Sequence, residues 1–202
     1  MGYDCIISPV IWQEPVAQAD VLLENCGADA FVATSGYALP ILANSQFALS
    51  KPLYLTGEIL ASKAKELGFL HIYHGDASGR SLLDYMAKDA DKSLHYVCLH
   101  SNHQAVNMAF ELQQLGFGAS SLEVYQTHPT KSLSEEAIIA LQQGDVAAIS
   151  LYSTMSAQSF MQLVEAANLQ HKLKRIKAIC LSQNIANVLP DGIFSEIIID
   201  NF

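Results

Sequence analysis

The chain has 202 residues, half of them apolar, and a formal net charge of -9. This length suits one large domain or two small ones, and the apolar content excludes a disordered chain. The acidic balance argues against a nucleic-acid partner, because phosphate binding needs a concentrated basic face, and the one basic cluster, Lys172–Lys177, is explained by a solvated helix end or loop before a strand.

No apolar run approaches the roughly 18 residues of a membrane span, so we expect no membrane partner. The N-terminal residues lack the basic patch and long apolar stretch of a signal peptide. A cytoplasmic location is therefore expected.

Short β-type runs alternate with amphipathic helical patterns along the chain, which predicts an α/β fold with parallel sheets. One helix is expected to end at Gly68, and another to place Ala157, Phe160 and Val164 on one face. The expected strands, in chain order, are Asp4–Ile7, Ala30–Thr34, Leu53–Leu55, Leu70–Tyr73, His95–Leu99, Leu122–Tyr125, Val146–Leu151, Ala178–Leu181 and Glu196–Ile199.

The sequence favours neither metal nor cofactor chemistry. Gly116–Gly118 follows a helix rather than a strand, so it cannot serve as a dinucleotide-binding loop. The pairs His71/His74 and His100/His103 lie in strands and loops, which do not present that spacing on one face. The four cysteines lie far apart beside apolar neighbours, and we interpret all of them as buried thiols: Cys5, Cys26, Cys98 and Cys180.

The chain repeats its own plan. The strand, hydroxyl-rich turn and helix start at Ala30–Gly36 recur at Ala148–Thr154, and a second pair of strand, turn and helix follows each. We therefore expect two similar lobes with a ligand cleft between them. The chain is expected to cross between the lobes twice, near Pro9–Pro15 and near His128–Pro129.

Each repeated turn places Ser, Thr or Gly at the carboxyl end of a parallel strand, where open α/β sheets bind ligands. Backbone N–H groups at a helix start can receive carboxylates or phosphates. Ordinary helix caps would explain each single turn as well, whereas the repetition favours a polyanion. The candidate binding residues are Thr34, Ser35 and Gly36; Thr56 and Gly57; Ser153 and Thr154; and Ser182, Gln183 and Asn184.

The order of these turns, the Val124–Pro129 segment and the Ser153–Phe160 turn and helix resemble the uroporphyrinogen-III synthase family over essentially the whole chain. The resemblance implies two flavodoxin-like lobes joined by two linkers, with no cofactor. It also implies a lyase of tetrapyrrole (haem) biosynthesis, which cyclises hydroxymethylbilane with loss of water and inversion of ring D.

In that interpretation residues 1–9 and 129–202 form the first lobe, residues 15–123 form the second, and residues of about 10–14 and 124–128 are linkers. Tyr125 matches the family tyrosine that helps to expel the hydroxyl. The hydroxyl turns are assigned to the substrate's carboxylates, and Ser101 and Asn102 are further candidates for substrate binding. A strand-end aromatic that only packs would be the alternative role of Tyr125.

Three departures from the family pattern leave a second function open. Leu60 stands where the family has a threonine, and the His100–Ala105 turn lacks the usual basic residue. The chain also begins at what resembles the family's second strand, so we expect either that its start was assigned late or that the first lobe lacks one strand and one helix. The alternatives are a non-catalytic tetrapyrrole-binding relative and, more remotely, a sensor of another small anion. A monomer is expected.

Overall fold

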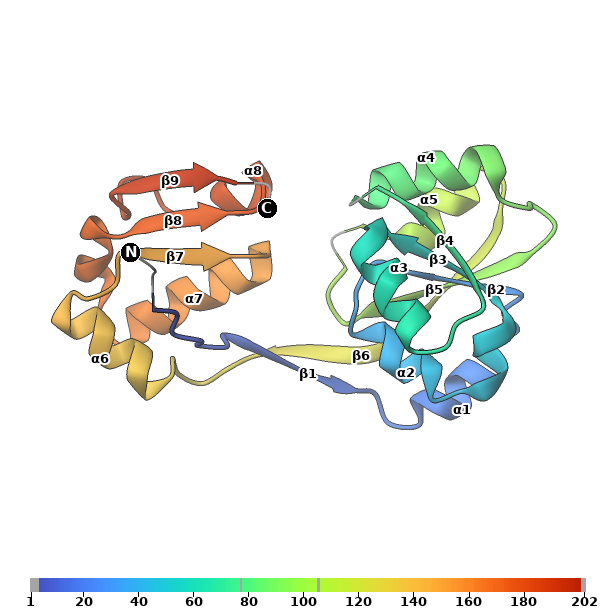
Figure 1. The fold of residues 1–202 in the computed structure, drawn as a ribbon, viewed down its shortest axis with the longest axis horizontal. Coiled ribbons are helices and arrows are strands. Elements are labelled where there is room, and N and C mark those ends of the chain that lie inside the picture. The colour runs from blue at the N-terminus through green and yellow to red at the C-terminus, as the bar shows by residue number, and fades with distance from the viewer. Residues whose placement is uncertain (1–3, 77, 105, 201–202) are drawn as a thin grey trace. The chain divides into compact units, whose positions relative to one another are not determined.

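The computed structural model describes residues 4–76, 78–104 and 106–200, in which helices and strands alternate (Figure 1). Met1–Tyr3, Ala77, Ala105, Asn201 and Phe202, which fall within the predicted lobes and the His100–Ala105 turn, lie outside the described residues. The chain divides into two compact units. Unit 1 comprises the residues up to Trp12 and those from His128 onward, and unit 2 comprises Gln13–Thr127.

Unit 2 holds a mostly parallel sheet with helices between successive strands. Its elements are α1 (Ala19–Glu24), β2 (Ala30–Ala33), α2 (Ala38–Ala43), the 3-10 helix η1 (Gln46–Ser50), β3 (Pro52–Thr56), α3 (Gly57–Glu66), β4 (His71–Gly75), α4 (Gly79–Asp89), β5 (His95–Ser101) and α5 (Met108–Gln114). Two further strands, β1 (Ile11–Pro15) and β6 (Gly118–Pro129), belong to the same sheet and each cross the boundary between the units.

Unit 1 holds a second parallel sheet. Its elements are α6 (Glu135–Gln143), β7 (Ala148–Leu151), α7 (Thr154–Ala166), the 3-10 helix η2 (Gln170–Arg175), β8 (Lys177–Cys180), α8 (Gln183–Ala186) and β9 (Glu196–Ile199). The strands lie in the order β7-β8-β9 (Figure 1). The α/β fold with parallel sheets expected from the sequence is confirmed, and eight of the nine expected strands occur near their predicted positions.

The strand predicted at Asp4–Ile7 is wrong: these residues have no regular secondary structure. A segment with strand propensity becomes a strand only where a neighbour's amides and carbonyls can pair with it. The N-terminal strand instead begins at Ile11, where β6 supplies that partner.

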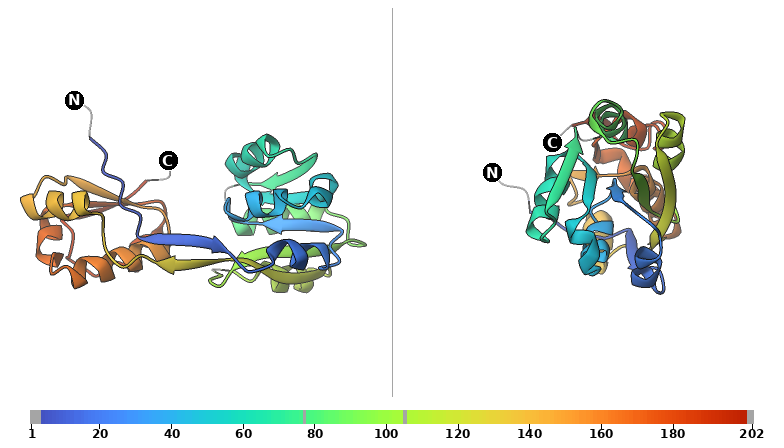
Figure 2. Two further views of the ribbon diagram at one scale, coloured as in Figure 1. Left: turned by 90° about the horizontal axis from the view of Figure 1, so that it is seen from below. Right: turned by 90° about the vertical axis from the view of Figure 1, so that its right-hand side faces the viewer.

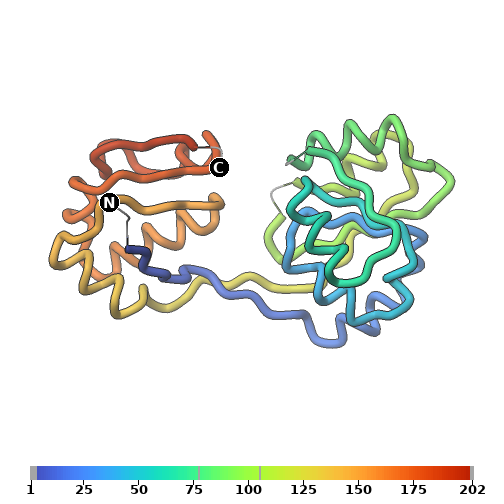
Figure 3. Tube along the Cα trace, in the orientation of Figure 1, coloured from blue at the N-terminus to red at the C-terminus, as the bar shows by residue number. Residues whose placement is uncertain are grey.

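Strands β1 and β6 form an antiparallel ribbon, seen as a blue and a yellow-green segment side by side in Figure 2 and Figure 3. The amide of Val16 donates to the carbonyl of Val124 at 3.1 Å, and the amide of Thr130 donates to the carbonyl of Val10 at 3.0 Å. The residues predicted as linkers, about 10–14 and 124–128, thus lie in or beside two paired strands.

The core of unit 2 has two layers because its buried strands alternate their side chains. On β2, Phe31 and Ala33 face a cluster that includes α1, α2 and α3, whereas Ala30 and Val32 face a cluster that includes α4 and α5. This two-sided burial explains why the strands are almost continuously apolar. The sheet order is β1-β6-β5-β2-β3-β4. Its parallel part therefore follows the doubly wound Rossmann order rather than that of flavodoxin itself.

The sheet of unit 1 is covered on one face. Leu151, Ala178 and Cys180 pack into a cluster with α6, α7, α8 and η2. The register places Ser150 beside Ile179 and Ile198 on the opposite face, where none of the three is buried.

The cysteine interpretation holds in part. Cys98 and Cys180 are buried, whereas Cys26 is half-buried and Cys5 is exposed, because Cys5 precedes the first strand rather than lying within one. Burial raises the pKa of the Cys98 thiol to about 12. Within the described ranges, no helix combines the length and the hydropathy that crossing a membrane requires.

Candidate functional site

The turns singled out in unit 2 follow neighbouring strands. Strand β2 lies between β5 and β3, all parallel, so their carboxyl ends share one edge of the sheet. The chain leaves β2 toward the helices of one face and β5 toward those of the other, which makes this pair the topological switch point. The structure therefore brings together Thr34–Gly36, Thr56–Gly57 and Ser101–Asn102.

The turn after β2 is held by local contacts. The Ser35 hydroxyl accepts from the amide of Tyr37 at 3.3 Å. The hydroxyl of Thr56 donates to the Thr34 carbonyl at 3.5 Å, which links this turn to the next one. The ammonium of Lys63 donates to the Gly36 carbonyl at 3.2 Å, so a cation lies against the turn.

Helix α3 starts without a side-chain cap. Its first residue, Gly57, has φ +76°, a conformation that suits glycine, and the side chain of its N-cap residue Thr56 accepts no bond from the helix amides. The unpaired N–H groups of the first turn are therefore left for solvent or for a ligand. Glu58 is the acidic residue in that turn.

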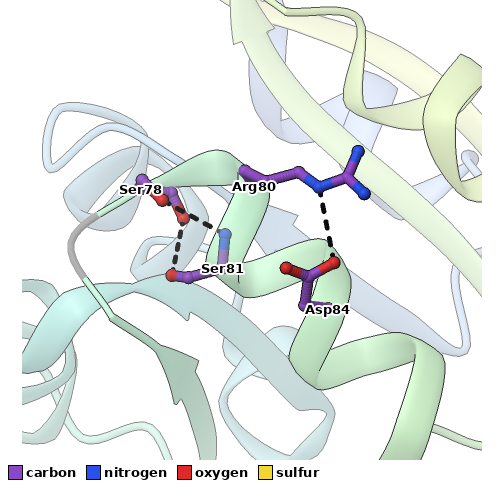
Figure 4. A network of polar contacts seen from close by, with 4 residues as sticks. All are labelled: Ser78, Arg80, Ser81 and Asp84. Carbon is purple, nitrogen blue, oxygen red and sulfur yellow. Dashed lines mark hydrogen bonds and ion pairs between the residues drawn. The ribbon is translucent and has the colours of Figure 1, made fainter.

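Helix α4 shows the contrasting arrangement (Figure 4). The Ser78 hydroxyl accepts from the amide of Ser81 at 3.1 Å, and the Ser81 hydroxyl donates to the Ser78 carbonyl at 3.1 Å. Arg80 pairs with Asp84 at 3.4 Å, with both side chains largely exposed. Ser78 therefore caps the start of α4, and Arg80 is paired with an acidic side chain.

Ser101 and Asn102 are occupied by contacts within the protein. The buried Ser101 hydroxyl accepts from the His103 amide at 3.1 Å and donates to the His103 carbonyl at 2.7 Å. The Asn102 carboxamide clamps the backbone of Thr127, accepting from its N–H at 2.9 Å and donating to its carbonyl at 3.3 Å. This clamp follows a register shift between His100 and Ser101.

Tyr125 lies on β6 directly beside Ser101. It is 5% exposed, and its ring centroid lies 5.1 Å from that of Tyr37. The Tyr37 hydroxyl donates to the carbonyl of Gln13 at 2.7 Å. Among the described residues, nothing hydrogen-bonds the Tyr125 hydroxyl.

The turns of unit 1 share the carboxyl edge of their own sheet, since β7 and β8 are parallel neighbours. Ser153 caps α7: its hydroxyl accepts from the Ser156 amide at 3.0 Å and lies 2.8 Å from the Ser156 hydroxyl. Thr154 is the first residue of that helix. Ser153 therefore acts as an ordinary N-cap of α7, which is the alternative role considered for each hydroxyl turn.

The last turn opens the short helix α8. Ser182 precedes it without capping it, and Asn184 is exposed. The Gln183 carboxamide donates to the Asn187 side-chain oxygen at 2.8 Å. Beside it lies a groove of about 470 Å³, lined by Gln183, Ala186, Asn187, Leu189, Asp191, Ile197 and Ile199.

Sequence reasoning missed Lys63 and Tyr37. Lys63 lies on α3 about two helical turns after the N-cap residue Thr56, a spacing that brings it to the same side of the helix as that residue. That periodicity could have identified it. Tyr37 could have been found as the first large side chain after the Thr34–Gly36 turn. Across the residues that the structure describes, no three His, Cys, Asp or Glu side chains gather where a metal ion could bind.

Comparison with known proteins places these features in a family. The model of the family described as uroporphyrinogen-III synthase HemD matches residues 1–201. No curated protein sequence matches the chain significantly.

Solved structures share the fold. Uroporphyrinogen-III synthetase from Helicobacter pylori superposes with a TM-score of 0.67 at 17% identity, over 93% of this chain and 83% of that one. A mutant uroporphyrinogen III synthase from Thermus thermophilus gives a TM-score of 0.56 at 20% identity, over 94% of this chain and 81% of that one. The wild-type protein of the same organism gives 0.51 at 20% identity, over 94% and 80%.

Proposed function

Because this chain belongs to the uroporphyrinogen-III synthase family, we propose that its residues carry out that family's reaction, the cyclisation of hydroxymethylbilane to uroporphyrinogen III in haem biosynthesis. In that reaction the terminal hydroxymethyl carbon loses its oxygen as water. The hydroxymethyl carbon bonds to the α-carbon of ring D that already carries the methylene bridge from the neighbouring ring, and that bridge bond breaks. The bridge carbon then bonds to the free α-carbon of ring D, which releases its proton, so the macrocycle closes with ring D inverted. The family assignment is the observation that carries the proposal.

The enzyme's main task in this proposal is positioning. The bilane also closes without help, giving the uninverted isomer, so holding the end rings in one geometry decides the product. The substrate's acetate and propionate groups offer many carboxylates to grip. The turns Thr34–Gly36, Thr56–Gly57, Ser153–Thr154 and Ser182–Asn184 are proposed to bind them through hydroxyl and backbone N–H groups.

The uncapped start of α3 supports this role best. Its first amides have no side-chain acceptor, and the neighbouring Thr34–Gly36 turn holds the ammonium of Lys63. Ser101 and Asn102 are proposed to support substrate binding indirectly. They would hold in place the strand ends from which the binding turns begin. Their polar atoms already serve His103 and Thr127.

Tyr125 is proposed as the residue that hydrogen-bonds the departing hydroxyl. A phenol donating to a leaving oxygen lowers the barrier to breaking the carbon–oxygen bond. No described residue accepts a hydrogen bond from the Tyr125 hydroxyl, and the ring packs beside that of Tyr37. We further propose that the protein acts as a monomer in the cytoplasm, as expected from its sequence.

The test is a product assay. Purified protein given freshly prepared bilane is expected to yield mainly uroporphyrinogen III, separated from the uninverted isomer by chromatography after oxidation. Uninverted product alone, at the rate of the uncatalysed reaction, would overturn the proposal.

A second candidate, a tetrapyrrole-binding relative without activity, is favoured by Leu60 in the turn region of α3 and by the cap that occupies Ser153. Binding of uroporphyrin III with an unchanged isomer ratio would establish that function instead.

A further inference from the structure

We infer that Lys63 is a carboxylate-binding residue of the substrate site in unit 2, an inference that rests on the proposed function. The observation is the contact of its ammonium with the Gly36 carbonyl at 3.2 Å. An ammonium has three N–H donors, and this bond uses one. The remaining donors lie at the Thr34–Gly36 turn, which was selected for carboxylate binding on independent grounds.

The charge of Lys63 has no acidic partner among the residues that the structure describes. The side chain is exposed, and its contact is to a neutral carbonyl. Arg80 and Lys177, by contrast, pair with Asp84 at 3.4 Å and Glu196 at 2.8 Å. A polycarboxylate that reaches this turn therefore meets a cation whose charge no described acidic side chain neutralises.

Gly36 lies against the side chains of Leu60 and Lys63. A Cβ atom at Gly36 would lie 3.2 Å from a methyl carbon of Leu60 and 3.6 Å from the Lys63 nitrogen. Leu60 and Lys63 thus cover the space that the glycine leaves open. Leu60 stands where members of the resembled family have a threonine, so this chain has no hydroxyl at that position. The ammonium group of Lys63 lies one helical turn further along α3.

The geometry assigns Lys63 to binding rather than to proton transfer. A carboxylate held by Lys63 could also accept from the uncapped N–H groups at the start of α3. Since the substrate's carboxylates are charged both before and after the reaction, this interaction stabilises the bound substrate and the transition state alike. Its loss is therefore expected to raise KM and to leave kcat unchanged.

The test compares Lys63→Gln with Lys63→Arg. Glutamine keeps an N–H donor for the Gly36 carbonyl but removes the charge, whereas arginine keeps both. We expect Lys63→Gln to raise KM for the bilane about fivefold, as for a favourable exposed ion pair, and Lys63→Arg to restore it. Lys65→Gln, two residues along on the same helix and also exposed, is the matched control and is expected to match the wild type.

A second readout separates this inference from the proposed activity. Fluorescence titration with uroporphyrin III, a stable polycarboxylate, measures binding without turnover. Weaker binding by Lys63→Gln with an unchanged Tm supports the inference even if no inverted isomer forms, in which case only the proposed activity fails.

Equal binding and equal KM for Lys63→Gln and the wild type would overturn the inference while leaving the activity intact. A lowered Tm in Lys63→Gln would assign the lysine to holding the turn and would overturn it too. Failure of the wild-type protein to bind uroporphyrin III would overturn the inference, whereas the product assay alone decides the proposed activity.

Discussion

Single side chains in this protein divide into those whose polar atoms are already used and those whose polar atoms are not. Ser101, Asn102 and Ser153 each make strong hydrogen bonds within their own turns or to a neighbouring strand. Tyr125 and Lys63 each keep at least one donor that no described residue takes up. A polar group without a partner inside the protein can bind a substrate without first giving up a hydrogen bond. Residues of the second class are therefore the better candidates for substrate binding and catalysis.

For Tyr125 we expect the Phe substitution to lower kcat several-fold. The loss should remain well under the roughly 100-fold of an indispensable general acid, because water can also protonate the leaving oxygen. The ring and its packing against Tyr37 are retained, so the Tm should not change. Steady-state kinetics and thermal unfolding measure the two quantities.

Tyr73→Phe is the control for Tyr125, since its ring stacks on Tyr54 at the far edge of the sheet. It is expected to behave as the wild type. Unchanged turnover in Tyr125→Phe would leave packing as the role of that residue.

At the scale of elements, the starts of helices carry the candidate chemistry, and they differ in how they are closed. Helices α4, α6 and α7 each begin with a serine that accepts from an amide of the first turn, whereas α3 does not. A capped start is stable by itself, with the cap contributing about 1 kcal/mol. A helix start without a side-chain cap lacks this stabilisation, and a bound ligand that accepts from the free N–H groups can supply it.

The substitution Ser153→Asp separates capping from substrate binding at α7. Aspartate caps a helix about as well as serine, so the free energy of unfolding should stay within about 0.5 kcal/mol of the wild type. If the turn receives a substrate carboxylate, the added negative charge should raise KM about fivefold. Urea unfolding and bilane kinetics provide the measurements.

Ser134→Asp at the start of α6 is the matched control, because Ser134 caps its helix in the same way but belongs to no candidate turn. It should leave KM unaltered. A normal KM in Ser153→Asp as well would mean that the α7 turn does not contact the substrate.

For the molecule as a whole, both cores carry buried groups that resist ionisation. Burial raises the pKa of Cys98 in unit 2 from 9.0 to about 12 and raises the pKa of Cys180 in unit 1. Desolvation also raises the pKa of Tyr54, with Tyr96 adding to the shift. Above their ordinary pKa these groups release protons only on unfolding, so the unfolded state binds fewer protons and stability falls as the pH rises.

We therefore expect a contribution of Cys98 that is complete below about pH 9 and is lost progressively toward pH 12, by about 1.4 kcal/mol per pH unit. Urea unfolding at about pH 8 and about pH 10 measures it. The wild type should lose about 1.4 kcal/mol more between these two conditions than Cys98→Val, which has no thiol to ionise. Equal losses in both proteins would show that the thiol ionises as readily when folded.

Local pattern predicted the fold class because strands and helices follow from side-chain periodicity, which is a property of neighbouring residues. The helix end at Gly68, the buried helix face of Ala157, Phe160 and Val164, and the buried strand Ala30–Ala33 could be predicted because each depends only on neighbouring residues. The strand at Asp4–Ile7 failed for the opposite reason: the residues have the propensity, but pairing needs a partner strand that periodicity does not supply.

The candidate turns likewise were visible in the sequence, since hydroxyl residues after an apolar strand mark the end of that strand. Which of them keep free donors was settled only by the folded chain. The capping of Ser153, the clamp of Asn102 on Thr127, 25 residues away, and the reach of Lys63 to Gly36, 27 residues away, all depend on how separate segments meet. Hydrogen bonds form according to distance in space, and distance along the chain does not fix it.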